Sequence, residues 1–145
     1  MSFEICDVSF MNLKAEHIFR LKELNVDVVY LFGSYAENVQ HSLSDLDIGI
    51  VLQNEEQLRQ NSFERYNEFY DLFTEVFSQF DSELDIVFLN TAPLELQFDV
   101  VRHGKVLFEI SQEERLSYED RIQMLSMDFH PLLQEMNAAV LEKIV

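Results

Sequence analysis

The chain has 145 residues, of which 27 are acidic and 10 are basic, so its formal net charge at pH 7 is −17. A surface this negative repels phosphate backbones and anionic membranes, which argues against direct nucleic-acid or membrane binding and favours a basic protein partner or divalent cations. The same acidity is equally consistent with a role in solubility alone. No stretch reaches the roughly 20 apolar residues of a membrane span.

The remaining composition predicts one domain over residues 1–145 that works in the cytoplasm. The chain is 48% hydrophobic and has few glycines and prolines, which argues against linkers and low-complexity segments. Its one cysteine, Cys6, excludes an internal disulfide, so a reducing compartment is expected. The opening residues lack the basic and apolar segments of a secretion signal.

The first half of the chain predicts a helix followed by two strands. Apolar residues at helical spacing indicate a helix from Asn12 to Leu24, with Asn12 as its N-cap. The β-branched and aromatic run Val26–Phe32 stops at Gly33 and is typical of a buried strand. The run Leu46–Leu52 predicts a second strand.

A long helix is predicted next, from Gln53 to Phe80. It carries aromatic residues at alternating steps of three and four: Phe63, Tyr66, Tyr70, Phe73, Phe77 and Phe80. Such a stripe can fit the groove of a partner, but covering a sheet is its commoner use. We therefore expect these side chains in the core.

The remaining elements complete a mixed α/β pattern. A third strand is expected at Glu83–Leu89, a short helix at Pro93–His103 with Gly104 as its stop, and a fourth strand at Lys105–Glu109. The segment at about 111–145 is predicted to be mainly helical, with a break at Pro131. The fold class is then α/β (α+β), with a mixed sheet of about four strands covered by helices.

Two aspartates stand one residue apart where the second strand begins. Asp45 and Asp47 share a face of that strand, while the apolar residues between and after them point into the core. Gly49 follows on the aspartate face and is expected to leave space beside them. Two like charges on one face repel, and a bound Mg²⁺ would remove that repulsion.

The third strand adds a further carboxylate. Asp85 alternates with apolar neighbours, so it is expected to face the same side of the sheet as Asp45 and Asp47. Three carboxylates that converge from two strands suit a two-metal site for phosphoryl or nucleotidyl transfer.

Gly33 and Ser34 follow the first strand. A glycine here lets the backbone approach a phosphate closely, and the serine hydroxyl can donate to it. Taken alone, the pair is better explained as an ordinary turn with a serine N-cap. In combination with the aspartates, the spacing G-S-x10-D-x-D is far more specific.

This motif, with Asp85 as the third aspartate, resembles the DNA polymerase β-like nucleotidyltransferase superfamily. The short chain and the stretch "LDIVFLNTAPLELQFDVVRHGKVLFE" resemble its minimal nucleotidyltransferases (MNT), in particular the MntA-type antitoxins paired with HEPN ribonuclease toxins. The resemblance implies a polymerase β-like fold and transfer of AMP from ATP to a tyrosine of the toxin.

The resemblance also implies a role for each motif residue. Asp45 and Asp47 would bind two Mg²⁺ ions, while Asp85 would bind the catalytic metal and help to deprotonate the attacking hydroxyl. Gly33 and Ser34 would hold the β- and γ-phosphates of ATP.

One departure and two alternatives accompany this interpretation. Family members often have Arg-Gly where this chain has Glu37 and Asn38, which bears on nucleotide affinity rather than on the metal site. The chain could instead neutralise its toxin by binding alone, or it could modify a small molecule of the aminoglycoside type. The four histidines show no metal-ligand spacing and are expected to be exposed or capping residues.

Overall fold

The computed structural model describes residues 13–33, 45–78, 80 and 83–127, so Asn12 and the predicted break at Pro131 lie outside it. The first described helix begins at Ala15 with Lys14 as its N-cap, so the prediction of Asn12 as the cap is wrong. Four strands form one sheet in the order β3-β2-β1-β4: β1 (Val26–Phe32), β2 (Leu46–Leu52), β3 (Leu84–Phe88) and β4 (Lys105–Glu109). Strand β1 is antiparallel to both β2 and β4, whereas β2 and β3 are parallel. The predicted mixed sheet is confirmed.

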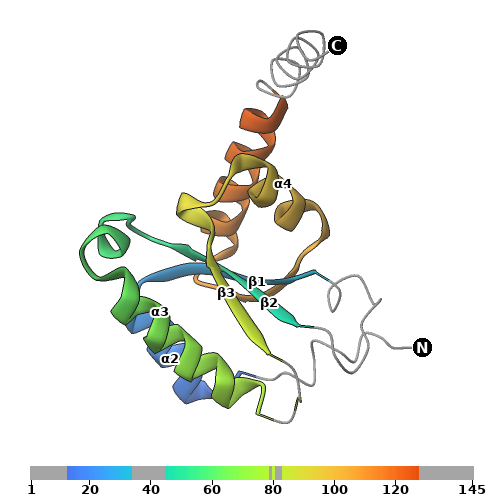
Figure 1. Ribbon diagram of the computed structural model, residues 1–145. Helices are drawn as coiled ribbons and strands as arrows, with labels where there is room; N and C mark the ends of the chain where they lie inside the picture. Colours follow the sequence, from blue (N-terminus) through green and yellow to red (C-terminus); the bar gives the residue numbers. More distant parts are fainter. Residues whose placement is uncertain (1–12, 34–44, 79, 81–82, 128–145) are drawn as a thin grey trace, which may run out of the picture.

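Helices cover both faces of this sheet (Figure 1). Helices α2 (Ala15–Glu23) and α3 (Glu56–Val76) lie side by side on one face. On the other face lie the short helix η1 (Leu89–Thr91), helix α4 (Leu94–His103) and helical residues 112–127. Among the described residues, no helix combines the length and the apolar character needed to cross a membrane.

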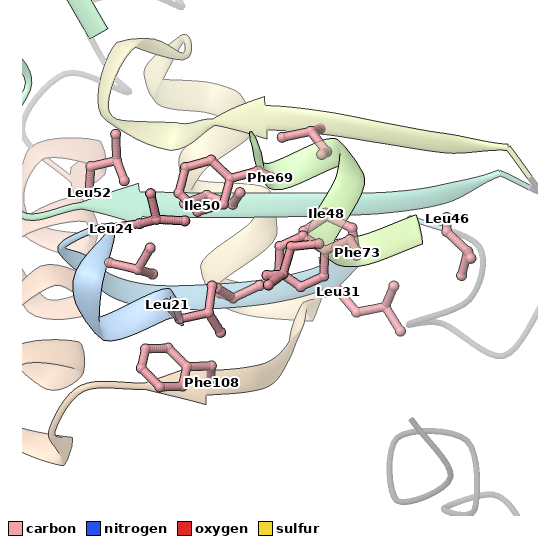
Figure 2. Packing of buried hydrophobic residues seen from close by; sticks show 14 of the residues in the cluster. Leu21, Leu24, Leu31, Leu46, Ile48, Ile50, Leu52, Phe69, Phe73 and Phe108 are labelled. Atoms are coloured by element: carbon pink, nitrogen blue, oxygen red, sulfur yellow. The ribbon is translucent and has the colours of Figure 1, made fainter. Parts of the chain in front are cut away.

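The face under α2 and α3 holds the larger apolar core. Leu46, Ile48, Ile50 and Leu52 of β2 are buried there, as the alternation along that strand predicts. Figure 2 shows how Leu21 of α2, Leu24 at the end of α2, and Phe69 and Phe73 of α3 pack over the strands. Complete removal of Phe69 and Phe73 from water makes this face a main source of stability.

Helix α3 differs from its prediction in length and in the residues that it buries. It runs from Glu56 to Val76 and contains a kink at Asn61, where φ is −141°. Phe63, just after the kink, is 75% exposed and Tyr70 is 39% exposed, so the prediction that these two belong to the core is wrong. The kink interrupts the regular 3.6-residue period, and the fully buried positions are Phe69, Leu72 and Phe73.

Helix α2 begins with a cap made by a histidine. The Nδ1 atom of His17 accepts a hydrogen bond of 3.2 Å from the Lys14 backbone N–H. Nδ1 is therefore unprotonated, and Nε2, which carries the proton, lies 3.3 Å from a carboxylate oxygen of Glu75 in α3. His17 is thus a buried capping residue that links the two helices, and the predicted capping role is confirmed.

The opposite face holds a second core that is richer in polar contacts. Tyr30 of β1 is buried there, and its hydroxyl donates a 2.7 Å hydrogen bond to Glu119. Arg115 donates to both Glu119 and Glu109, which ties helical residues 112–127 to the sheet through charged groups. Burial and the Glu119 carboxylate raise the pKa of the Tyr30 phenol well above its ordinary value.

Candidate functional site

Asp47 and Asp85 lie next to each other on the sheet. Strands β2 and β3 pair in parallel, and in their register Asp47 is the direct partner of Asp85. Directly paired residues of neighbouring strands project to the same face. The prediction that Asp85 faces the same side as Asp47 is therefore confirmed, and both carboxylates project away from the core under α2 and α3.

The three predicted carboxylates influence one another electrostatically. The pKa of Asp47 is raised from 3.8 to about 6, first by partial burial and then by the negative charges of Asp85 and Asp45. Asp45 and Asp85 are exposed, whereas Asp47 is half-buried between them. The sequence therefore brings together a cluster of like charges whose repulsion a cation would relieve.

Gly33 lies directly beside this cluster. Its φ of +79° is in the left-handed region that favours glycine, and a Cβ atom at this position would collide with Oδ2 of Asp47. The neighbouring residue Phe32 pairs with Asp47 across β1 and β2, which accounts for the close approach. Gly33 thus lets the chain turn away from β1 while leaving room for the Asp47 carboxylate.

Gly49 does not leave the open space that was expected. A Cβ atom there would lie 3.0 Å from Cδ1 of Leu89 and 3.4 Å from a ring atom of Phe32. Leu89 fills the position because η1 folds back over β2. The side chain of Asn90 fixes η1 there by accepting from and donating to the backbone of Leu52, at 2.8 and 2.9 Å.

The packing of Leu89 and Asn90 beside the site was missed from the sequence. The segment "NTAP" indicates only that a strand ends, and it does not show that an asparagine side chain binds the backbone of Leu52 at the end of β2. The predicted phosphate contact Ser34 and the departures Glu37 and Asn38 lie outside the described residues.

The donor set fits a hard divalent cation. Mg²⁺ prefers carboxylate oxygens and commonly uses one or two of them together with substrate phosphates. The pKa of Asp47 is raised first by burial and then by the negative charges of Asp85 and Asp45, which lie where such an ion would bind. Within the described ranges, however, no three His, Cys, Asp or Glu side chains already form a group able to hold a metal ion. The metal-binding roles therefore remain predictions.

The structure combines a mixed sheet with paired aspartates that lie beside a glycine at the end of a strand. These features define a class of protein, and comparison with known families identifies that class. Residues 14–113 match the family model described as polymerase beta, nucleotidyltransferase. The chain belongs to this nucleotidyltransferase family. The predicted fold class and the predicted enzyme class are both confirmed.

Comparison with individual proteins gives more specific matches than the family model does. The chain is 29% identical over 120 residues to the protein adenylyltransferase MntA of Shewanella oneidensis, covering 83% of this chain and 77% of that protein. A crystal structure of a toxin–antitoxin with AMP-PNP matches with 26% identity and a TM-score of 0.56, covering 86% of this chain and 98% of the other.

A second solved structure supports the fold alone. It is a tri-AMPylated Shewanella oneidensis HEPN toxin in complex with an MNT antitoxin, matched at 21% identity and a TM-score of 0.51, with 86% of this chain and 98% of the other covered. The curated relative and the AMP-PNP structure confirm the predicted resemblance to MntA-type MNT proteins.

Proposed function

We propose that this protein transfers AMP from ATP to a tyrosine hydroxyl of a partner HEPN ribonuclease toxin and so acts as its antitoxin. The observation that carries the proposal is the direct pairing of Asp47 with Asp85, beside a glycine whose side-chain space is taken by the Asp47 carboxylate. The similarity to the adenylyltransferase MntA supports AMP as the transferred group and a protein as the acceptor.

The residues of the cluster take distinct roles in this proposal. Asp45 and Asp47 would hold two Mg²⁺ ions, with Asp85 as a further carboxylate ligand. When bound, these ions neutralise the triphosphate and stabilise the leaving pyrophosphate. Gly33, together with Ser34, binds the β- and γ-phosphates through backbone N–H groups and the serine hydroxyl.

The transfer itself is a balanced substitution at phosphorus. The tyrosine oxygen forms a bond to the α-phosphorus, the bond from that phosphorus to the bridging oxygen breaks, and pyrophosphate leaves. The phenolic proton passes to a carboxylate of the cluster, for which Asp85 is the proposed acceptor because its side chain is exposed.

The partners and the compartment of this proposal follow from charge and chemistry. A net charge of −17 supports a protein rather than a nucleic acid or a membrane as the direct partner. Dependence on ATP and the presence of a single thiol support a cytoplasmic location.

Intact-mass analysis of the toxin tests the proposal. The purified toxin is incubated with this protein, ATP and Mg²⁺, in parallel with Asp45→Ala/Asp47→Ala protein. Asp71→Ala is a matched control, because Asp71 is an exposed aspartate of α3 on the opposite side of the sheet. We expect the toxin to gain one or more AMP units with the wild type and the control, and none with the double variant.

Two results would contradict the proposal in different ways. If the toxin gains no mass and both the wild type and the double variant still inhibit it, the protein is an antitoxin that acts by binding alone. If the toxin is neither modified nor inhibited while an aminoglycoside gains AMP, the protein is a small-molecule nucleotidyltransferase.

A further inference from the structure

Strand β3 carries Asp85 but lies at the edge of the sheet. It has five residues, it pairs with β2, and its ladder ends where Phe88 meets Ile50. The register of a strand is fixed by its contacts, and a slip by one residue turns every side chain to the opposite face of the sheet. The position of Asp85 beside Asp47 therefore depends on the contacts that fix β3 along β2.

Asn90 extends this ladder with its side chain. It lies 38 positions from Leu52 along the chain, the same separation that relates Asp85 to Asp47 in the strand register. Its Oδ1 accepts a 2.8 Å hydrogen bond from the Leu52 N–H, and its Nδ2 donates a 2.9 Å bond to the Leu52 carbonyl. The side-chain amide thus takes the place of a backbone peptide of β3, at a point where the backbone has already left the sheet as η1.

Leu89 adds a steric lock to the same register. It is completely buried, and a Cβ atom on Gly49 would lie only 3.0 Å from its Cδ1. Gly49 pairs with Val87, so the leucine two residues later packs into the space that this glycine leaves on β2. The neighbouring positions of β2 on this face are Asp47 and Val51, whose side chains would exclude Leu89 from a shifted register.

The segment that carries this lock is also tied to the helices above it. Gln97 of α4 donates a 2.8 Å hydrogen bond to the carbonyl of Ala92, directly after η1. The same side chain accepts a 2.9 Å bond from the Tyr118 hydroxyl. Asn90 is therefore held between β2 and α4, which Figure 1 shows on this face of the sheet.

We propose that Asn90 is a positioning residue that locks β3 in register on β2 and so holds Asp85 beside Asp47. The inference rests on the proposed function for the reaction that Asp85 serves. Asn90 binds β2 about 16 Å along the strand from Asp47, so it acts through the strand and not on substrate or metal. Placement of this kind matters to catalysis, because a shift of about 1 Å can cost about 100-fold in rate.

Hydrogen exchange and NMR test the lock in protein without ATP, metal or toxin. Asn90→Ala removes both hydrogen bonds to Leu52, so the β3 amide groups that pair with β2 are expected to exchange at least about tenfold faster. Nuclear Overhauser contacts between Asp47 and Asp85 are expected to weaken. Asn54→Ala is the matched control, because the Asn54 side chain also accepts a backbone hydrogen bond but lies just before α3. Its β3 amides should exchange as in the wild type.

Transfer kinetics test what the lock does for the site. Well below the melting temperature of each variant, Asn90→Ala is expected to lower kcat for AMP transfer about 10–100-fold and to change KM for the toxin less than about twofold. A loss of stability alone would leave kcat of the folded enzyme unchanged, as expected for Asn54→Ala. Asn90→Asp has the same size but cannot donate to the Leu52 carbonyl, so it should show the same changes to a smaller extent. It serves as the test variant if Asn90→Ala does not fold.

A size exchange tests the steric part of the lock. Leu89→Ala leaves a void over Gly49, and Gly49→Ala presses on Leu89, so each variant should accelerate β3 exchange and lower kcat. The double variant Leu89→Ala/Gly49→Ala places a methyl group in the void and should recover part of both losses. Losses that simply add in the double variant would exclude this packing from the lock.

Two results would overturn the proposal. One is β3 exchange and Asp47–Asp85 contacts in the Asn90 variants that equal those of the wild type. The other is faster exchange with an unchanged kcat, which would make Asn90 a structural residue alone. If the wild type transfers no AMP to the toxin, the proposed function fails, and exchange and NMR still decide whether Asn90 holds Asp85 beside Asp47.

Discussion

The two faces of the sheet differ in what they bury. Under α2 and α3 the strands present an almost purely aliphatic and aromatic surface. Among the described residues, His17 is the buried polar residue on this face. The other face combines apolar residues with the buried Tyr30 hydroxyl, a network of charged groups and, at one end, the Asp47–Asp85 pair.

The difference shows how one set of strands serves stability and chemistry at once. Because side chains alternate along β2, Ile48 is completely buried while its neighbour Asp47 keeps part of its surface in water. The closed face fixes the position of the strands, and the other face uses that position to hold like charges close together. Substitutions on the two faces should therefore separate stability from activity.

The largest effect is expected from Phe73→Ala on the closed face. Phe73 is 0% exposed and packs in the main core, so the substitution should lower the free energy of unfolding by about 3–5 kcal/mol. Chemical denaturation measures this loss, and Phe63→Ala, at an exposed position of the same helix, should cost less than about 0.5 kcal/mol. Similar losses for the two variants would show that α3 packs on the sheet in a different way.

Asp85→Asn is expected to reduce activity while leaving stability intact. Removal of one negative charge from the cluster should reduce the rate of AMP transfer at least about 100-fold, equivalent to about 2.7 kcal/mol of activation free energy. The melting temperature should stay the same or rise slightly, because repulsion with Asp47 is removed. Asp99→Asn, at an exposed position of α4, is the control. Full activity of Asp85→Asn would exclude Asp85 from the site.

Gly33→Ala should affect both properties. An L-residue at a φ of +79° costs about 1–3 kcal/mol, and the added Cβ would displace the Asp47 carboxylate. Thermal unfolding and the transfer rate are measured on the same preparation. Gly104→Ala is the comparison: Gly104 has a negative φ of −73°, and an added Cβ would press on the backbone oxygen of Val100, so this variant should cost stability without displacing the Asp47 carboxylate. If Gly33→Ala were as active as the wild type, the close packing against Asp47 would not be needed for catalysis.

The smallest effect is a pH dependence of stability. The folded-state pKa of Asp47, about 6, lies above its ordinary value of 3.8, so the folded state binds this proton more tightly than the unfolded state does. The contribution of Asp47 to stability is therefore present at low pH and is lost as the pH rises from about 4 to about 6. Asp47→Asn should remove this decline and stabilise the protein at pH 7 by about 0.5–1 kcal/mol.

Denaturation curves at about pH 4.5 and about pH 7 measure this difference. An unchanged pH dependence in Asp47→Asn would show that other groups cause it. Addition of Mg²⁺ to the wild type at pH 7 should give a stabilisation of the same sign, because the cation would relieve the same repulsion.

Strand positions and the faces of the aspartates could be predicted from the sequence because they depend on local pattern. The β-branched runs predict the positions of β1 and β2, and the alternation of side chains places Asp47 on the opposite face of the sheet from Ile48. The sequence predicts that Asp47 and Asp85 share a face of the sheet. It does not predict that they are direct partners, because the register between strands is decided by tertiary packing.

Other features depend on contacts that local pattern does not encode. The kink at Asn61 exposes Phe63, although the spacing of Phe63 is that of a core residue. Leu89 fills the space beside Gly49 because Asn90 binds the backbone of β2, a contact between residues 38 positions apart. The hydrogen bond from Tyr30 to Glu119 spans 89 positions and has no signal in the sequence.

An NMR titration of the Asp47 carboxyl carbon, with and without Mg²⁺, tests most directly whether Asp47 and Asp85 form a metal-binding centre. We expect a pKa of about 6 for Asp47 in the absence of the ion, a marked fall when Mg²⁺ is added, and a lower pKa in Asp85→Asn protein. An ordinary carboxyl pKa that responds neither to Mg²⁺ nor to Asp85→Asn would contradict the claim that this pair forms the metal-binding centre of the site.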